Sequence, residues 1–390
     1  MRGAAPGRGD SAAACRPPRT TPPAAYRPPP TPAMPSPYTV PMRCFVVVPG
    51  ALFPAPLAAD LVGEARRQRR LTQLERLVAR ASVQAYDALP PVAARAPQLF
   101  WTWAQFGGSG GPVSAPYVAA LLAQRAVPGA LWHCDPVHIA LARDHLLVTA
   151  LDDAPPTPAQ DEALFHEAAA AALELGAQMH RWQARWFIAF DPPWQLQAVP
   201  LAAVLDHSMQ EAMPGGADAA RWRKLFTEIQ IRWHRHPVNE AREAAGQPAI
   251  NGLWLHGGTA DALPALESPF VHVVADAPSL QSWAAATQTP AHALHPLPAL
   301  ADGDVLVQVD GLAAAHRREA WADWLAAAAA VDATLAAIEA QVRPRGGQIE
   351  LLLFGTHGVR RVVAAAGDRW RLWRRQALVD VLAEPQEGVQ

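Results

Sequence analysis

Lysine is almost absent from this sequence, which has 390 residues and a single lysine, Lys224. A GxxxxGK phosphate-binding loop is excluded, because that motif requires a lysine after its last glycine. A lysine Schiff base or a lysine general base would have to use Lys224. The apolar spacing around Lys224 places it off the buried stripe of a predicted helix, so neither chemistry is expected.

Cysteine is also scarce, and Cys15, Cys44 and Cys134 are far apart with no CxxC pair. They predict neither a disulfide framework nor a zinc ribbon, and they are typical of a reduced cytoplasmic protein. No apolar run reaches the length of about 18 residues that a membrane span needs, so no membrane partner is expected. The N-terminus has arginines without an apolar segment, unlike a secretory signal.

Neither sign of charge dominates, since 33 Lys and Arg residues face 35 Asp and Glu residues and the formal net charge is −2. This balance argues against a protein whose main partner is a nucleic acid or an anionic membrane. One basic run falls on a predicted helix, and we interpret it as a solvated face rather than a nucleic-acid contact. Its residues are Arg66, Arg67, Arg69, Arg70, Arg76 and Arg80.

Residues 1–41 contain 12 of the 39 prolines. Such a segment buries too little apolar surface to offset its ordering entropy, so we predict a disordered Pro-rich tail with polyproline-II character. It is either a ligand for a partner domain or a segment upstream of the true start. We favour the second interpretation, because a strand is predicted to begin at Met42.

Short apolar runs bounded by turn residues are typical of strands that are covered on both faces. Amphipathic helices are predicted between such runs, at 217–235 and 316–342, and Trp182–Phe190 alternates like a half-exposed antiparallel strand. The pattern predicts an α/β fold with a mostly parallel sheet flanked by helices and some antiparallel strands mid-chain. The apolar runs are Cys44–Val48, Phe270–Val274, Val305–Val309 and Ile349–Phe354.

Glycine and proline mark loops at 107–116 and 214–216. The second loop divides the chain into an N-terminal α/β lobe over 42–213 and a C-terminal α/β lobe over 217–390. One continuous domain over 42–390 is the alternative.

The glycine-rich segment 107–111 satisfies the pattern GxSxG around Ser109. A nucleophile elbow needs a strand before the serine and a helix directly after it, whereas Pro112 and Pro116 follow here. We therefore predict a flexible loop. The same glycines would suit a phosphate-binding backbone, but no helix N-terminus is predicted close behind them.

The segment His133–His138 holds three potential metal ligands. A turn at Pro136 would bring Asp135 and His138 together around a metal ion. An Asx-type turn with a capping histidine explains the same residues, and we do not favour a metal here.

The segment 234–258 is the richest in polar residues around a predicted strand. It ends a helix at Pro237 and enters an apolar strand closed by Gly257 and Gly258. Polar side chains at strand tips lie where open α/β sheets bind ligands, although each also suits a structural role in a turn. With part of the preceding segment, the candidate binding pocket comprises Asp135, His138, Asn239, Arg242, Asn251, Trp254 and His256.

These residues carry a resemblance that covers 42 to about 380. The order Asp135–His138, His236–Asn239, Ala241–Arg242 and Ile250–Gly258 resembles the RpfE-type regulatory proteins of proteobacteria. That family is itself similar to the archaeal-type cofactor-independent phosphoglycerate mutases of the alkaline phosphatase superfamily. The second resemblance implies two divalent metal ions, such as Mn or Zn, and a serine or threonine nucleophile.

The chain departs from the mutase pattern at three positions where that family holds its metals. Pro49–Gly50 replaces Asp-Gly after the first strand. Asp310 and His316 replace Asp-x-x-x-His with a longer spacing, and Thr356–Gly358 replaces Asp-His-Gly. The resemblance therefore implies a retained fold with a degenerate dinuclear site and no resident cofactor.

Our leading hypothesis is a non-catalytic regulatory or binding protein on a phosphoglycerate-mutase-like scaffold. Its partner would be an unknown protein or a small anionic ligand, and the candidate pocket residues would line a residual pocket or hold its loops. The rival is an active metal-dependent phosphotransferase or phosphatase, with Ser109 or Ser114 attacking. That rival needs convergence of His133, Asp135, His138, Asp310, His316 and His357.

Overall fold

The computed structural model describes residues 42–89, 96–127, 130–142, 145–151, 153–205, 207–370 and 375–385. These residues belong to one compact unit, Val40–Gln390. The predicted Pro-rich tail over 1–41 lies outside them, so that prediction is not tested. Within the described ranges one helical segment, Trp321–Arg345, is apolar and long enough to cross a membrane, but half of its most apolar window is buried inside the protein.

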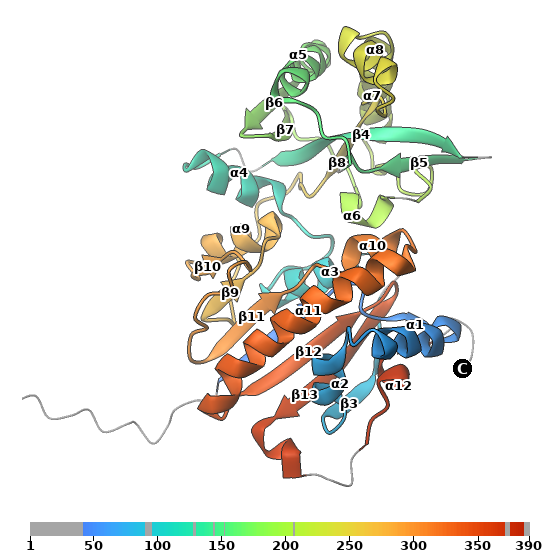
Figure 1. Cartoon of the computed structure of the whole chain (residues 1–390). Coiled ribbons are helices and arrows are strands. Elements are labelled where there is room, and N and C mark those ends of the chain that lie inside the picture. The colour runs from blue at the N-terminus through green and yellow to red at the C-terminus, as the bar shows by residue number, and fades with distance from the viewer. Residues whose placement is uncertain are drawn as a thin grey trace, which may run out of the picture. The chain divides into compact units, whose positions relative to one another are not determined.

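The larger sheet has seven strands among the described residues, in the order β10-β9-β11-β1-β12-β13-β3 (Figure 1). The first five of these run parallel, and the last two pair antiparallel. The four predicted apolar runs form its centre, which confirms the mostly parallel sheet. The strands are β1 (Arg43–Val48), β3 (Ser82–Ala88), β9 (His272–Val274), β10 (Ala291–His292), β11 (Asp304–Gln308), β12 (Gln348–Phe354) and β13 (Gly358–Ala365).

Helices cover both faces of this sheet, as its apolar strands require. One face packs against α1 (Ala55–Arg67), α2 (Thr72–Val78) and α11 (Trp321–Val342), and Figure 1 shows α11 lying across it. The other face packs against α3 (Pro97–Gln105) and α9 (Pro278–Ala286).

The helix that the sequence predicts over 316–342 is two helices. A short helix, α10 (Ala313–Arg317), precedes α11, and Glu319 between them has a φ of 52°. This left-handed conformation ends α10 and lets the chain turn. The predicted apolar stripe of α11 is buried, so a core helix rather than a coiled coil is confirmed.

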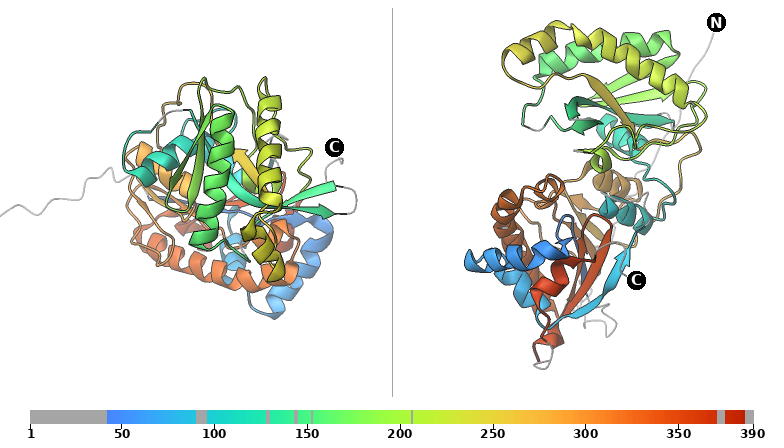
Figure 2. Two further views of the ribbon diagram at one scale, coloured as in Figure 1. Left: turned by 90° about the horizontal axis from the view of Figure 1, so that it is seen from above. Right: turned by 90° about the vertical axis from the view of Figure 1, so that its right-hand side faces the viewer.

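The smaller sheet is antiparallel, with the order β5-β4-β7-β6 and with β8 also paired to β4. Helices α5 and α7 pack together over it, and Figure 2 shows them side by side. The helix predicted over 217–235 is α7, with Lys224 exposed as predicted. The elements are β4 (Leu131–Ala142), β5 (His145–Thr149), β6 (Ala177–Trp182), β7 (Arg185–Phe190), β8 (Gly252–His256), α4 (Ala115–Ala123), α5 (Pro158–Glu174), α6 (Leu201–Val204), α7 (Ala219–His234) and α8 (Pro237–Ala244).

Two local predictions are wrong in this region. Trp182–Phe190 is not one strand, because Gln183, with a φ of 55°, turns the chain between β6 and β7. Pro136 makes no turn, since it lies inside β4 opposite Leu253 of β8. Antiparallel pairing with β8 keeps the chain extended through Pro136, whereas a single sequence shows no partner strand.

The basic run is also not on one helix. α1 ends at Arg67, Arg69 has a φ of 55°, and α2 begins at Thr72. Arg66 pairs with Glu75 at 2.7 Å, which lowers the positive charge of this surface.

A short two-stranded sheet joins β2 (Phe53–Pro54) to β14 (Ala383–Glu384). The preceding helix α12 (Leu378–Leu382) buries three apolar side chains in the core. Both main sheets take strands from either side of the 214–216 loop. The division into lobes 42–213 and 217–390 stays a prediction, and we propose its alternative, one continuous domain over 42–390.

Candidate functional site

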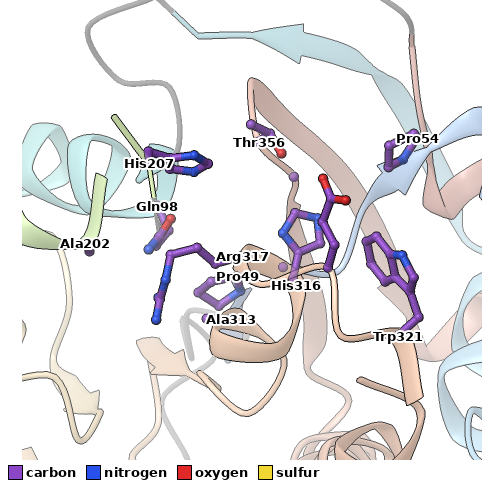
Figure 3. A pocket seen from close by; sticks show the side chains of 13 residues that line it. Pro49, Pro54, Gln98, Ala202, His207, Ala313, His316, Arg317, Trp321 and Thr356 are labelled. Atoms are coloured by element: carbon purple, nitrogen blue, oxygen red, sulfur yellow. The ribbon is translucent and has the colours of Figure 1, made fainter. Parts of the chain in front are cut away.

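The carboxyl edge of the larger sheet contains a pocket. β1, β11 and β12 are parallel, so the segments that follow them meet at one edge, which is where open α/β sheets bind ligands. The pocket has a volume of ≈ 150 Å³. Figure 3 shows Arg317 and Gln98 on one side of it and Trp321 beyond His316 on the other. Its lining is Pro49, Gly50, Pro54, Gln98, Ala202, His207, Ala313, His316, Arg317, Glu319, Trp321, Gly355 and Thr356.

Gly50 allows α10 to approach the end of β1. Its φ is +73°, and a Cβ there would lie 2.8 Å from the Cβ of His316 and 3.0 Å from the carbonyl oxygen of Leu312. The Gly50 carbonyl accepts a 2.8 Å hydrogen bond from the indole of Trp324. A glycine at this position therefore places His316 and Arg317 at the pocket.

His316 is a neutral hydrogen-bonding group rather than a cation. Its Nε2 lies 2.6 Å from the carbonyl oxygen of Leu52, to which it must donate, and its ring meets Trp321 edge-on at 5.8 Å between centroids. Burial lowers the pKa of His316, and the Leu52 hydrogen bond and the charges of Glu384 and Glu319 oppose that shift only in part. Arg317 contributes a guanidinium to the pocket lining, and Glu319 contributes a carboxylate.

Glu384 is held beside the pocket by backbone amides. The N–H of Thr356 donates to its Oε2 at 3.1 Å, and the N–H of His357 donates to its Oε1 at 2.9 Å. The hydroxyl of Tyr86 donates to the same Oε1 at 2.7 Å. Glu384 is 5% exposed, so these contacts form in a nearly dry environment.

The donors at this edge do not fit a dinuclear metal centre. Pro49 has no ligand atom, and the Asp310 carboxylate accepts hydrogen bonds from Gln308 Nε2 at 2.9 and 3.0 Å. Burial raises the pKa of Asp310, and hydrogen bonding by Gln308 opposes this only partly. Throughout the described ranges, no three His, Cys, Asp or Glu side chains lie where they would hold one ion.

The serines of the rival hypothesis do not line this pocket. Ser109 is in the loop after α3, and Ser114 immediately precedes α4. A helix therefore does follow the glycine-rich loop, contrary to the prediction. Its first amides are occupied, because the N–H groups of Ser114 and Ala115 both donate to the Gly257 carbonyl, at 2.7 and 2.8 Å.

Asn239 and Asn251, from the predicted pocket, bond backbone groups around the smaller sheet. Asn239 Nδ2 donates to the carbonyls of Trp233 and Ile250 at 2.9 and 2.8 Å, and its Oδ1 accepts from the Ile250 N–H at 2.8 Å. Asn251 bonds both the N–H and the carbonyl of Ile139, at 2.6 and 3.0 Å. Both amides therefore hold the loops around α7, α8 and β8.

Arg242, Trp254 and His138 make similar contacts. Arg242 is 1% exposed and donates to the carbonyls of Pro248 and Ala154 and to Gln160 Oε1, at 2.9, 2.6 and 3.2 Å. The indole of Trp254 donates to the Val199 carbonyl at 3.2 Å. His138 Nδ1 lies 2.6 Å from the Ala249 carbonyl. These side chains join loops, and Arg242 has its donors committed to protein oxygens.

Asp135 and His256 form a separate pair. His256 Nε2 lies 2.7 Å from Asp135 Oδ2, and the ring of His133 stacks on His256 at 4.8 Å between centroids. Burial lowers the pKa of His133 to about 3, so this ring is neutral near pH 7. Burial by itself raises the pKa of Asp135, but the hydrogen bond and charge of His256 outweigh it and the net shift is downward.

The structure thus separates the residues that the sequence grouped. Asp135, His133 and His256 meet on β4 and β8, whereas Asp310, His316 and His357 follow strands of the larger sheet. No sequence pattern predicted the positions of Arg317 and Glu384 at this edge. Arg317 could have been found from its place on the short segment that follows a core strand, but no local pattern marks Glu384.

No family model and no curated protein matches this chain. Several solved structures are similar to it, including two distant ones. The PH0037 protein from Pyrococcus horikoshii is 12% identical, with 86% of this chain and 90% of that one covered and a TM-score of 0.45. The cofactor-independent phosphoglycerate mutase from Thermoplasma acidophilum DSM 1728 is 14% identical, with 88% and 95% covered and a TM-score of 0.38. Both similarities are distant and lie in the backbone fold rather than in the sequence.

Proposed function

We propose that this protein is a non-catalytic binding protein with a regulatory role, and that it recognises a small oxyanion or an acidic group of a partner protein at the carboxyl edge of the larger sheet. The observation that carries the proposal is the lack of free metal ligands on the residues that follow the strands at that edge. Pro49 offers no ligand atom, Asp310 is hydrogen-bonded to Gln308, and the amides of Thr356 and His357 bind a carboxylate.

Metal-dependent phosphoryl transfer requires cations that neutralise charge on the transferred group. The donors present at this edge do not supply such a pair of sites, so no step through metal ions is assigned. The sequence resemblance to RpfE-type regulatory proteins supports the same conclusion. We also propose that the protein is bacterial and cytoplasmic.

Arg317 gives the pocket its preference for anions. A guanidinium presents a planar fork of donors that matches carboxylate and phosphate oxygens. Thr356 and Gln98 add neutral polar side chains to the lining, and His316 adds a neutral ring. A pocket of ≈ 150 Å³ suits an anionic head group rather than a large cofactor.

The test is a calorimetric titration of the protein with inorganic phosphate and with phosphoglycerate. We expect Arg317→Gln to weaken phosphate binding at least tenfold, or about 1.4 kcal/mol. Arg318→Gln is the matched control, because Arg318 neighbours Arg317 but its Nη1 lies 3.7 Å from Asp153 Oδ2 and it does not line the pocket. Equal phosphate affinity in the wild type and Arg317→Gln would remove the proposed site.

The same protein should be titrated with Mn²⁺ and Zn²⁺ and assayed for phosphoglycerate isomerisation and phosphate release. We expect neither turnover nor binding of two metals per chain. Stoichiometric binding of two metals together with turnover would replace the proposal with the rival, an active metal-dependent phosphotransferase or phosphatase.

A further inference from the structure

Three hydrogen-bond donors meet one carboxylate at the end of β12, two from the residues that follow β12 and one from Tyr86 of β3. The consecutive amides of Thr356 and His357 bind the two oxygens of Glu384, at 3.1 and 2.9 Å, and the Tyr86 hydroxyl adds a third bond at 2.7 Å. Consecutive amides that point at one acceptor are a recurrent way of binding anions in proteins. We call these three donors the β12 cradle.

Gly355 lies between β12 and the cradle and allows the Glu384 carboxylate to approach closely. A Cβ on residue 355 would lie 2.5 Å from Glu384 Oε2, so Gly355 is needed for this approach. Glu384 arrives from the far end of the described chain through β14, which pairs with β2 so that Glu384 lies opposite Pro54. The carboxylate is therefore brought to the cradle by tertiary structure.

The cradle borders the pocket of the proposed function. Gly355, Thr356 and Pro54 all line that pocket. The surroundings also favour negative charge, since Arg360 is close enough for Glu384 to influence it. Burial lowers the pKa of Arg360, and the charges of Asp380 and Glu384 oppose that shift.

We propose that the β12 cradle is an oxyanion subsite that the protein fills with its own Glu384, and that it accepts a carboxylate or phosphate group when that side chain is removed or displaced. The inference rests on the proposed function, because the cradle extends the same pocket. Glu384 then acts as an internal competitor, and the native pocket is left with the Arg317 side for a ligand.

Chemical rescue provides the sharpest test in the full-length protein. Glu384→Ala leaves these three partly buried donors without their acceptor. We expect formate to raise the thermal unfolding midpoint of Glu384→Ala by more than that of the wild type, relative to chloride at equal ionic strength. We also expect inorganic phosphate to bind Glu384→Ala at least tenfold more tightly than it binds the wild type, and to shift the amide NMR signals of Thr356 and His357.

Glu319→Gln is the matched control, because it removes a carboxylate from the pocket lining without changing the cradle. We expect no rescue by formate and no new shifts at Thr356 and His357. Equal gains in Glu319→Gln and Glu384→Ala would show a general charge effect and overturn the subsite.

Glu384→Gln keeps one carbonyl oxygen for the cradle and tests the inference if the alanine variant does not fold. We expect a smaller gain in phosphate affinity, with the same amide shifts. A folded Glu384 variant with wild-type phosphate affinity and no formate rescue would refute the cradle. Arg317→Gln could still weaken phosphate binding in that case, so the proposed function and this inference fail separately.

Discussion

The edge of the larger sheet and the polar cluster of the smaller sheet place their polar side chains in different surroundings. Around the smaller sheet, Asn239, Asn251 and Arg242 donate hydrogen bonds to backbone carbonyls. At the edge of the larger sheet, Arg317 and Thr356 line a pocket. A dense group of polar residues in a sequence therefore indicates demanding loop geometry as readily as it indicates a binding site.

The difference has a simple energetic cause. Loops around the smaller sheet leave buried backbone groups without partners in a helix or sheet, and each such group costs about 1–3 kcal/mol if it stays unsatisfied. Side-chain amides and a guanidinium supply the missing bonds. The strand ends of the larger sheet meet the short helix α10 instead, so a pocket remains open there.

Asn239→Ala gives the largest expected effect and tests the structural half of the comparison. Asn239 is 2% exposed and makes three hydrogen bonds to Trp233 and Ile250. Their loss should lower the free energy of unfolding by about 3 kcal/mol, measured by urea denaturation. Phosphate affinity should not change, because Asn239 does not line the pocket. If Asn239→Ala kept full stability but lost phosphate binding, Asn239 would have a binding role rather than a structural one.

His133 should make stability depend on pH. Its pKa is lowered from 6.5 to about 3 by burial in the folded protein, so between these pH values the unfolded chain binds a proton that the folded chain does not. The free energy of unfolding should therefore fall as pH decreases from about 6.5 toward about 3, by at most about 1.4 kcal/mol per pH unit from this residue. Urea denaturation across this range measures the slope.

His133→Phe should flatten that slope, because phenylalanine keeps an aromatic ring beside Phe187 and His256 but has no titrating group. His166→Phe is the control, since the His166 side chain is 71% exposed. The assignment is wrong if both variants retain the wild-type slope.

Lys224→Ala should have the smallest effect on stability and on phosphate binding, and it serves as the reference for the other variants. Lys224 lies on the exposed side of α7. We expect the free energy of unfolding to change by less than about 0.5 kcal/mol, with phosphate affinity unaltered. A large loss of phosphate binding in calorimetry would mean that the single lysine takes part in recognition.

The main elements of the fold were predictable because their signals are local. The apolar runs of β1 and β12 and the buried stripe of α11 depend on residue spacing within one segment. The turn at Gln183 and the strand through Pro136 were not predicted. In both cases the partner strand, rather than the segment itself, decides the conformation.

The candidate site was only partly predictable. The sequence identified Pro49 and the Thr356–His357 pair as strand ends, and both lie at the edge that holds the pocket or the cradle. It placed Asn239 and Arg242 among the pocket candidates, whereas their bonds join loops. Residue types alone cannot distinguish these uses, because the same donors serve a ligand or a carbonyl.

By itself, the sequence determined the apolar strands β1, β9, β11 and β12 and the buried stripes of α7 and α11. It also excluded a lysine-based phosphate loop and a side-chain metal ligand at Pro49. These properties follow from side-chain chemistry and from spacing along one segment. Only the tertiary structure decided that Glu384 reaches the amides of Thr356 and His357 and that Arg317 lines the pocket. Hydrogen bonds between distant segments depend on how the whole chain packs, which no local pattern specifies.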